Sequence, residues 1–249
     1  MSLAPVEAAD GLENNGAGMS EPERYPAVRT YGRRKGHRLS PRKQRLFDEL
    51  LPGLRPPLDA PAPQPLTGLF SASVSEVWLE IGFGAGEHLY WQARANPHAG
   101  IIGCEPFING VAALLGSLAD ENPGNVRIWD GDVRELLPWL PDGAISRVFI
   151  LHPDPWPKIR HRKRRLVSPQ TLRELARIMR RGAELRVATD IADYARTSLE
   201  AVRVSGLFEW TAQCAADWRE RSGDWPQTRY ERKALREGRK PVYMKFERL

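Results

Sequence analysis

Short, continuous apolar runs alternate with amphipathic helical patterns from residue 77 to residue 204, and this alternation limits the possible folds more than any other feature of the chain. The expected strands are Val77–Ile81, Ile101–Cys104, Val126–Trp129, Arg147–Leu151 and Leu185–Ala188. The expected helices are Glu87–Ala95, Ile108–Leu118, Val133–Leu140, Thr171–Arg180 and Tyr194–Val204. Strands without polar alternation are typical of a sheet buried on both faces. The pattern therefore predicts an α/β fold, with a parallel sheet covered by helices on both faces.

The last part of the chain departs from this alternation. Phe208–Cys214 and Val242–Phe246 are strand-like, and no helix of the usual length is expected between them. We expect these two segments to form an antiparallel pair at one edge of the sheet. The sheet would then be mostly parallel and seven-stranded.

Composition excludes several classes of protein. Of 249 residues, 41% are hydrophobic, too many for a chain disordered throughout. No apolar run approaches the ~18 residues of a membrane span, and the amino terminus lacks the basic-then-apolar order of a secretory signal. Cys104 and Cys214 lie far apart, so neither a disulfide framework nor a metal site is expected. A reducing compartment follows, most simply the cytoplasm.

Charge is distributed unevenly along the chain, whose net charge is +6. Residues 1–25 hold five acidic groups and one Arg, whereas residues 26–45 hold eight Lys or Arg and no acid. Two further runs, Lys158–Arg165 and Arg229–Lys240, each hold six basic residues. One such run alone would typify a solvated face, but three favour a polyanionic partner, and nucleic acid fits best. A membrane surface is disfavoured because no run has a matching apolar helical face.

These shifts in composition predict three parts. Residues 1–25 are expected to be a disordered acidic tail. Residues 26–70 are expected to form a basic arm, a short helix around Pro41–Leu51 and an extended linker, since residues 52–65 contain six prolines. Residues 71–249 are expected to form the α/β domain.

Three glycines follow the first expected strand, and they permit a tight turn close to a ligand. Gly82, Gly84 and Gly86 have the spacing G-x-G-x-G, and Glu87 stands where a dinucleotide fingerprint would have its third glycine. Glu80 precedes the loop, where it would repel a pyrophosphate but attract a cation. The glycines alone indicate a structural turn as much as a binding site.

Acidic residues also follow the second and third expected strands, at the edge where open parallel sheets bind ligands. Glu105 is suited to accept hydrogen bonds from a ribose diol, and Asp132, close after Asp130, from an adenine amino group. Either carboxylate alone would also serve to cap the next helix. With Glu80 and the glycines, they predict a pocket for a cationic nucleoside without phosphates, which describes S-adenosyl-methionine. NAD is the alternative, disfavoured by the glycine spacing and by Glu80.

The fourth expected strand leads into the segment PDPWPKIRHRKRRL. Asp154 stands between two prolines, so its backbone has little freedom and its carboxylate has a fixed direction. Trp156 offers a flat surface on which a base could stack, and Lys158 and the basic run behind it could hold a phosphate backbone. The structural alternative is that Trp156 is a core aromatic residue and that the Pro-Asp-Pro segment is a plain turn.

At this point the chain resembles the bacterial tRNA (guanine-N7-)-methyltransferase family. The segments that carry the resemblance are PDPWPKIRHRKRRL, LEIGFGAGEHL, ATDIADYA, TRYERK and the arm RTYGRRKGHRLSPRKQRLFDEL. They occur in order from about residue 29 to residue 249, and the first of them is the most specific. The glycine loop would be shared by many methyltransferases. His152 departs from the pattern, because the family more often has an aromatic residue there.

The resemblance implies a Rossmann-like class I methyltransferase that uses S-adenosyl-methionine to methylate N7 of the variable-loop guanosine, position 46, in tRNA. Its catalytic residue would be Asp154. The expected cofactor-binding residues are Glu80, Gly82, Gly84, Gly86, Glu105, Asp132 and Asp154. The expected substrate-binding residues are Lys158, Asp190, Thr228, Arg229, Tyr230 and Glu231. No obligate protein partner is expected, and the protein would be a monomer or a weak homodimer.

Guanine N7 carries a lone pair and no proton, so the reaction needs alignment more than proton removal. A carboxylate that accepts from the guanine N1–H and amino group would stabilise the positive charge that develops on the ring. We assign this role to one or more of Asp154, Asp190 and Glu231. The rivals are an oxidoreductase, a non-catalytic RNA-binding module, a methyltransferase for another RNA, and an amino-group methyltransferase. The last would carry [Asn/Asp]-Pro-Pro-aromatic, whereas this chain has Asp-Pro-Trp-Pro.

Overall fold

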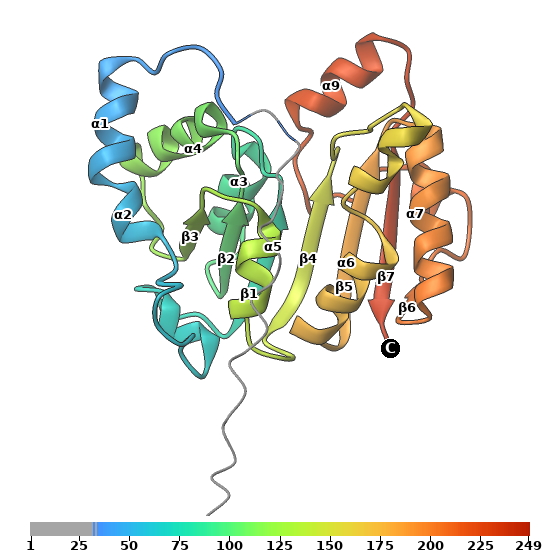
Figure 1. Ribbon diagram of the computed structural model, residues 1–249, viewed down its shortest axis with the longest axis horizontal. Helices are drawn as coiled ribbons and strands as arrows, with labels where there is room; N and C mark the ends of the chain where they lie inside the picture. Colours follow the sequence, from blue (N-terminus) through green and yellow to red (C-terminus); the bar gives the residue numbers. More distant parts are fainter. Residues whose placement is uncertain (1–31, 33) are drawn as a thin grey trace, which may run out of the picture.

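The computed structural model describes residue 32 and residues 34–249, so the predicted acidic tail and the start of the basic arm lie outside the described residues. Seven strands form one sheet in the order β3-β2-β1-β4-β5-β7-β6 (Figure 1). The strands are β1 Glu76–Ile81, β2 Ala99–Cys104, β3 Val126–Trp129, β4 Ile145–Leu151, β5 Met179–Thr189, β6 Phe208–Trp210 and β7 Val242–Arg248. Strands β1 to β5 are parallel to one another, and β7 pairs antiparallel with both β5 and β6. The predicted sheet is confirmed.

Helices cover the sheet, and most of them lie where the periodicity predicts. The α-helices are α1 Pro41–Glu49, α2 Leu51–Leu54, α3 Glu87–Ala95, α4 Ile108–Asp120, α5 Val133–Leu136, α6 Pro169–Ile178, α7 Ala192–Ser205, α8 Ala216–Arg219 and α9 Arg229–Arg236. The 3-10 helices are η1 Leu66–Leu69, η2 Leu137–Trp139 and η3 Ile159–Arg164. None of the helices in the described part of the chain is long and apolar enough to cross a membrane.

Local chemistry explains where the helices differ from expectation. Ser168 caps α6 through a bond from the Thr171 N–H, and Pro169 occupies the first turn, so the helix begins two residues before the predicted start. The helix expected at Val133–Leu140 is α5 for four residues and then the 3-10 helix η2, which contains Pro138 and its missing N–H. Two short helices, α8 and α9, lie between the strands of the antiparallel edge pair.

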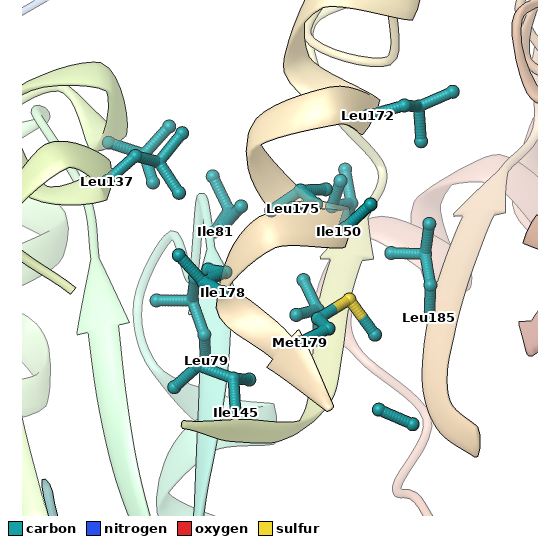
Figure 2. Packing of buried hydrophobic residues seen from close by; sticks show 14 of the residues in the cluster. Leu79, Ile81, Leu137, Ile145, Ile150, Leu172, Leu175, Ile178, Met179 and Leu185 are labelled. Atoms are coloured by element: carbon teal, nitrogen blue, oxygen red, sulfur yellow. The ribbon is translucent and has the colours of Figure 1, made fainter. Parts of the chain in front are cut away.

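Hydrophobic residues cover both faces of the sheet, as predicted. On one face, Leu79 and Ile81 pack with residues of η2, α6 and β5, and Figure 2 shows Leu175 and Ile178 of α6 over this layer. On the other face, Trp78 packs with a second cluster that includes residues of α2, α3 and α4. Because successive strand residues point to opposite faces, Glu80 points towards the α3 side.

The order of the strands reverses between β1 and β4. From β1 the chain runs outward through β2 and β3, and then returns to β4 and β5 on the other side. Ile81 is paired with Ile150, so the glycine loop after β1 and the Asp154 loop after β4 leave the sheet side by side. Such a switch point is where open α/β sheets bind ligands. Figure 1 shows α9 above this end of the sheet.

The described part of the basic arm crosses the start of α4 at the same end of the sheet. The Ile108 N–H donates to the Arg34 carbonyl, and the Gly36 N–H donates to Asn109 Oδ1. The Asn109 amide in turn donates to the His37 carbonyl. The arm is therefore tied to α4, three to four residues after Glu105.

Candidate active site

The glycine loop has the left-handed backbone that the sequence predicts for it. The φ angles of Gly82, Gly84 and Gly86 are 78°, 59° and 80°, which residues with a side chain adopt only with strain. A Cβ at Gly84 would lie 3.0 Å from the Tyr230 ring. The predicted cofactor loop and the predicted substrate segment therefore lie side by side.

Glu105 is buried and is bound to that loop. Its Oε2 accepts from the Gly84 N–H and its Oε1 accepts from the Phe107 N–H, both at 2.8 Å. Burial raises the pKa of this carboxyl, and the nearby charges of Asp154 and Glu80 act in the same direction. The backbone bonds fix both oxygens and leave each with a further lone pair, which suits a vicinal diol.

Close packing below the loop depends on Gly110, which the sequence reasoning missed. A Cβ on Gly110 would lie 2.1 Å from the Gly84 carbonyl oxygen. Helix α4 can therefore approach the glycine loop only because residue 110 lacks a side chain. The available signal was a glycine in the first turn of the helix that follows Glu105.

Glu80 lies at the end of β1, but an internal partner holds it. It is 2% exposed, and its Oε2 is 2.7 Å from His88 Nδ1. The other ring nitrogen of His88 is 3.1 Å from the Gln92 amide nitrogen, which also donates to the Asp224 carbonyl. Glu80 and His88 line a hollow with Gly82, Arg229 and Tyr230, among others. The acid predicted from its position thus comes with a histidine partner that the sequence reasoning missed.

Asp132 lies after β3 as predicted and caps α5. Its Oδ1 accepts from the Arg134 N–H, and the Arg134 guanidinium lies 2.6 Å from Oδ2. Asp130, two residues earlier, is held by two bonds of 2.7 Å from Arg55. The capping alternative therefore applies to Asp132, and its contact with a cofactor stays a prediction.

The loop after β4 is strained on both sides of Asp154. His152 and Trp156 have φ angles of 50° and 40°, a region that L-residues rarely occupy. Asp154 is exposed, although partial desolvation of its carboxyl raises its pKa. The Cβ position of Gly32 in the basic arm lies 3.6 Å from Asp154 Oδ2. The Arg164 guanidinium lies over the Trp156 ring, 5.0 Å from its centroid. One face of the predicted stacking platform is therefore already covered.

Asp190 follows β5 and reaches the same edge of the sheet. Arg239 Nε donates to its Oδ2 at 2.5 Å, and His152 Nδ1 lies 3.4 Å from its Oδ1. Burial acts to raise the pKa of Asp190, but the hydrogen bonds from Arg239, its own backbone and His152 outweigh it, so the pKa is lowered. Burial in turn lowers the pKa of His152.

The predicted substrate segment 228–231 begins α9. The Thr228 side chain caps the helix by accepting from the Glu231 N–H, and the Arg229 N–H donates to Glu87. Glu231 is buried, and its Oε1 accepts from Arg221 and from the Tyr243 hydroxyl, at 3.1 and 2.9 Å. The Thr-x-x-Glu spacing is also the signature of a helix start. This spacing alone indicates that Glu231 has a structural role at the start of α9, as an alternative to contact with the substrate.

The basic run after Asp154 is divided between two environments. Lys158 is exposed, as a phosphate contact requires, and so are Arg160 and Lys163. Arg165 is buried, and the prediction that the whole run faces a phosphate backbone is wrong for it. Arg162 is half-buried, and its guanidinium binds Asp193 at 2.8 Å.

Comparison with known proteins gives a consistent result. Residues 75–244 match the family described as "Putative methyltransferase". The tRNA (guanine-N(7)-)-methyltransferase of Ruegeria pomeroyi is 54% identical over 230 residues, which are 90% of this chain and 96% of that protein. The enzyme of the same name from Rhodospirillum rubrum is 50% identical over 89% of this chain and 88% of its own. The chain belongs to the tRNA (guanine-N(7)-)-methyltransferase family.

Solved structures support the fold of this family member. The 16S rRNA methyltransferase KamB superposes with a TM-score of 0.51 at 19% identity, over 71% of this chain and 90% of that one. A 16S rRNA (adenine(1408)-N(1))-methyltransferase from Catenulisporales acidiphilia superposes with a TM-score of 0.50 at 16% identity, over 72% and 88%. These likenesses confirm the Rossmann-like class I methyltransferase fold. The segments outside the matched range 75–244 include the basic arm.

Proposed function

We propose that this protein transfers a methyl group from S-adenosyl-methionine to N7 of guanosine 46 in the variable loop of tRNA. One observation carries this most directly: Asp154 stands in a rigid loop at the switch point, beside the glycine loop that Glu105 holds. Family membership supports methyl transfer to guanine N7 of tRNA, because the relatives at 50–54% identity are named for that activity. We also propose that the protein acts in the cytoplasm, where tRNA is found, and that it is a monomer or a weak homodimer.

The residues at the switch point fit S-adenosyl-methionine, which supplies an electrophilic methyl group on a sulfonium. The two oxygens of Glu105 would accept from the ribose hydroxyls, and the left-handed glycine loop lets backbone approach closely. Glu80 and the rim carboxylates provide negative charge, which suits a sulfonium. Asp132 would accept from the adenine amino group. We propose these roles for Glu80, Gly82, Gly84, Gly86, Glu105 and Asp132. Asp154, which is also expected beside the cofactor, would act mainly on the guanine.

Three carboxylates were candidates for holding the guanine, and their surroundings differ. Glu231 is bonded to Arg221 and Tyr243, and Asp190 to Arg239. Asp154, by contrast, forms neither a hydrogen bond nor an ion pair with another residue in the described part of the chain. We propose that Asp154 accepts from the guanine edge and that Asp190 and Glu231 shape the wall of the site. Lys158, Thr228, Arg229 and Tyr230 would contact the rest of the nucleotide.

The Asp154 carboxylate need not remove a proton, because guanine N7 has none. Its work would be to fix the ring so that N7 lies in line with the methyl carbon and sulfur. Positive charge spreads over the guanine as the methyl group arrives, and a fixed carboxylate then interacts more strongly than it did in the ground state. The arm beside Asp154 would help to exclude water.

The proposed function is tested with bulk unmodified tRNA and labelled cofactor. We expect label in 7-methylguanosine after digestion to nucleosides, and loss of the label when position 46 is not guanosine. Label in a methylated adenine or in an exocyclic amine would support one of the rival methyltransferase activities. Absence of any labelled nucleoside would contradict the proposal.

Glu105 gives a pH dependence whose sign follows from its raised pKa. The ionised carboxylate binds a diol best, so affinity for S-adenosyl-methionine should be full at pH 8. As the pH is lowered through the pKa of Glu105, which lies above the ordinary value for glutamate, this affinity should fall by about tenfold. The fall reflects the loss of charge-assisted hydrogen bonds to the diol. Titration calorimetry from pH 5 to pH 8 measures this. Glu105→Gln should bind weakly and lose the dependence, whereas Glu121→Gln, at an exposed acid, should keep it. A pH-independent Kd in the unaltered protein would contradict the role.

The exposed cations after Asp154 should contribute to the binding of tRNA and not to the binding of the cofactor. Replacing Lys158, Arg160 and Lys163 together with Gln is expected to weaken tRNA binding and to lower the salt-dependence slope by about 2–3, because each cation that binds a phosphate adds about one to that slope. Cofactor affinity should not change. In the matched control, Arg180, Arg181 and Arg203 are replaced with Gln. This variant loses the same charge as the first, but from other exposed positions. Equal weakening by both triple variants would show general attraction instead of a defined surface.

A further inference from the structure

Arg165 is a buried arginine that joins the Asp154 loop to α7. Its side chain is 3% exposed, although it ends a run of six cations in eight residues. Its Nε donates to the Pro155 carbonyl at 3.0 Å, and its Nη1 donates to Thr197 Oγ1 at 2.7 Å. Its guanidinium also lies over the Tyr194 ring, 5.1 Å from the centroid. A guanidinium has five donors in a fixed plane, so these bonds define its position.

Asp193 is the charged partner of Arg165. Its Oδ2 accepts from Arg165 Nη2 at 2.7 Å, and its Oδ1 accepts from Arg162 and Arg196 at 2.8 and 2.6 Å. The bonds from Arg165 and Arg196 lower the pKa of Asp193 to about 2. Asp193 is therefore ionised throughout the pH range in which an enzyme of this kind works.

The two ends of this connection lie next to the proposed guanine-binding groups. Pro155, whose carbonyl Arg165 holds, directly follows Asp154. Asp193 is three residues after Asp190, in the first turn of α7. The loop between His152 and Trp156 is strained at both of these residues, and strained backbone persists only where surrounding contacts determine it. The hydrogen bond from Arg165 to Pro155 is such a contact.

We propose that Arg165 and Asp193 are positioning residues that hold the Asp154 loop at a fixed place relative to Asp190, so that the guanine is aligned for methyl transfer. This inference rests on the proposed function. Neither residue would touch the guanine or the cofactor, because both act through the Pro155 carbonyl and α7.

Single-turnover methyl transfer at saturating tRNA and cofactor tests the inference. Arg165→Lys keeps the charge but cannot donate to Pro155, Thr197 and Asp193 together, and Asp193→Asn removes the ion pair. We expect each variant to slow transfer by about 10- to 100-fold, as misplacement of about 1 Å can do. The Kd for S-adenosyl-methionine should stay within about threefold, since Arg165 and Asp193 form no hydrogen bond with Glu105 or the glycine loop in the described part of the chain. Arg196→Gln is the matched control, because Arg196 is exposed and also donates to Asp193. It should stay within about twofold of the unaltered rate.

A second comparison separates positioning from a general effect on the fold. In a chain that already carries Asp154→Asn, adding Asp193→Asn should slow transfer by less than about threefold, because the group being positioned has lost its charge. Equal slowing in both backgrounds, or loss of cofactor affinity in step with the rate, would overturn the inference. So would full rates in Arg165→Lys and Asp193→Asn. If Arg165→Lys fails to fold, Asp193→Asn and the milder Thr197→Val decide. Failure of the unaltered protein to form 7-methylguanosine would instead count against the proposed function.

Discussion

Asp154→Ala is expected to slow single-turnover methyl transfer by about 10²–10³-fold while S-adenosyl-methionine still binds. The lost carboxylate would be the group that interacts with the guanine more strongly as positive charge develops, and loss of one such group typically costs this much. The site retains Glu105 and the glycine loop, so cofactor affinity should change little. Rapid quenching with labelled cofactor and saturating tRNA gives the rate, and calorimetry gives the Kd.

The Asp154→Asn variant, measured from the lowest pH at which the protein stays folded up to pH 9, distinguishes charge from shape. Partial desolvation of its carboxyl raises the pKa of Asp154, so the charged form is lost at a higher pH than for an ordinary aspartate. The rate of the unaltered protein should therefore fall as the pH is lowered through that raised pKa, and the Asn variant should be slow and pH-independent over the same range. An Asn variant with the full rate would remove the carboxylate from the chemical step.

Gly110→Ala is expected to lower S-adenosyl-methionine affinity by more than about 30-fold and to destabilise the fold by about 1–3 kcal/mol. The added Cβ would stand 2.1 Å from the Gly84 carbonyl oxygen. Backbone on both sides cannot turn aside as a flexible side chain can, so α4 or the glycine loop must move. That movement would break the bond between the Gly84 N–H and Glu105, which fixes the proposed diol-binding carboxylate.

Gly116→Ala provides the matched control on the same helix. A Cβ on Gly116 meets nothing within 4 Å, and alanine is favoured over glycine inside a helix by roughly 0.5–1 kcal/mol. This variant should bind cofactor normally and melt at the same or a higher temperature. Calorimetric titration and thermal unfolding of both variants check the pair. Normal cofactor binding by Gly110→Ala would show that the close contact between α4 and the loop is not required.

The sheet was predictable because its strands are buried on both faces. A run such as Ile101–Cys104 has few alternatives once helical patterns stand on either side of it, and it lies within β2, all of whose residues are buried. The rim acids Glu105 and Asp154 were predictable for a related reason. Polar residues directly after buried strands must lie at one edge of a parallel sheet, whatever the details of the helices.

The pairings of the other charged residues around the site could not be predicted in the same way. Nothing local distinguishes Arg164, which lies over the Trp156 ring, from its neighbour Arg165, which is buried against α7. The choice depends on the 3-10 turn of η3, which places residues three apart on one side, so that Arg162 and Arg165 both reach Asp193. The pairing of Glu80 with His88 likewise depends on how β1 and α3 pack. Such contacts are properties of tertiary structure, and a charge count along the chain does not contain them.

Strand β7 lies inside the sheet, with β5 on one side and β6 on the other, although its residues, 242–248, come after those of every other strand. During synthesis, β5 and β6 are therefore made before the strand that joins them. The exposed edge of β5 would meanwhile be open to pairing with other chains. The sheet is thus completed by the late insertion of β7, and substitutions along β7 that weaken its pairing with β5 and β6 would lower the yield of folded protein in the cell.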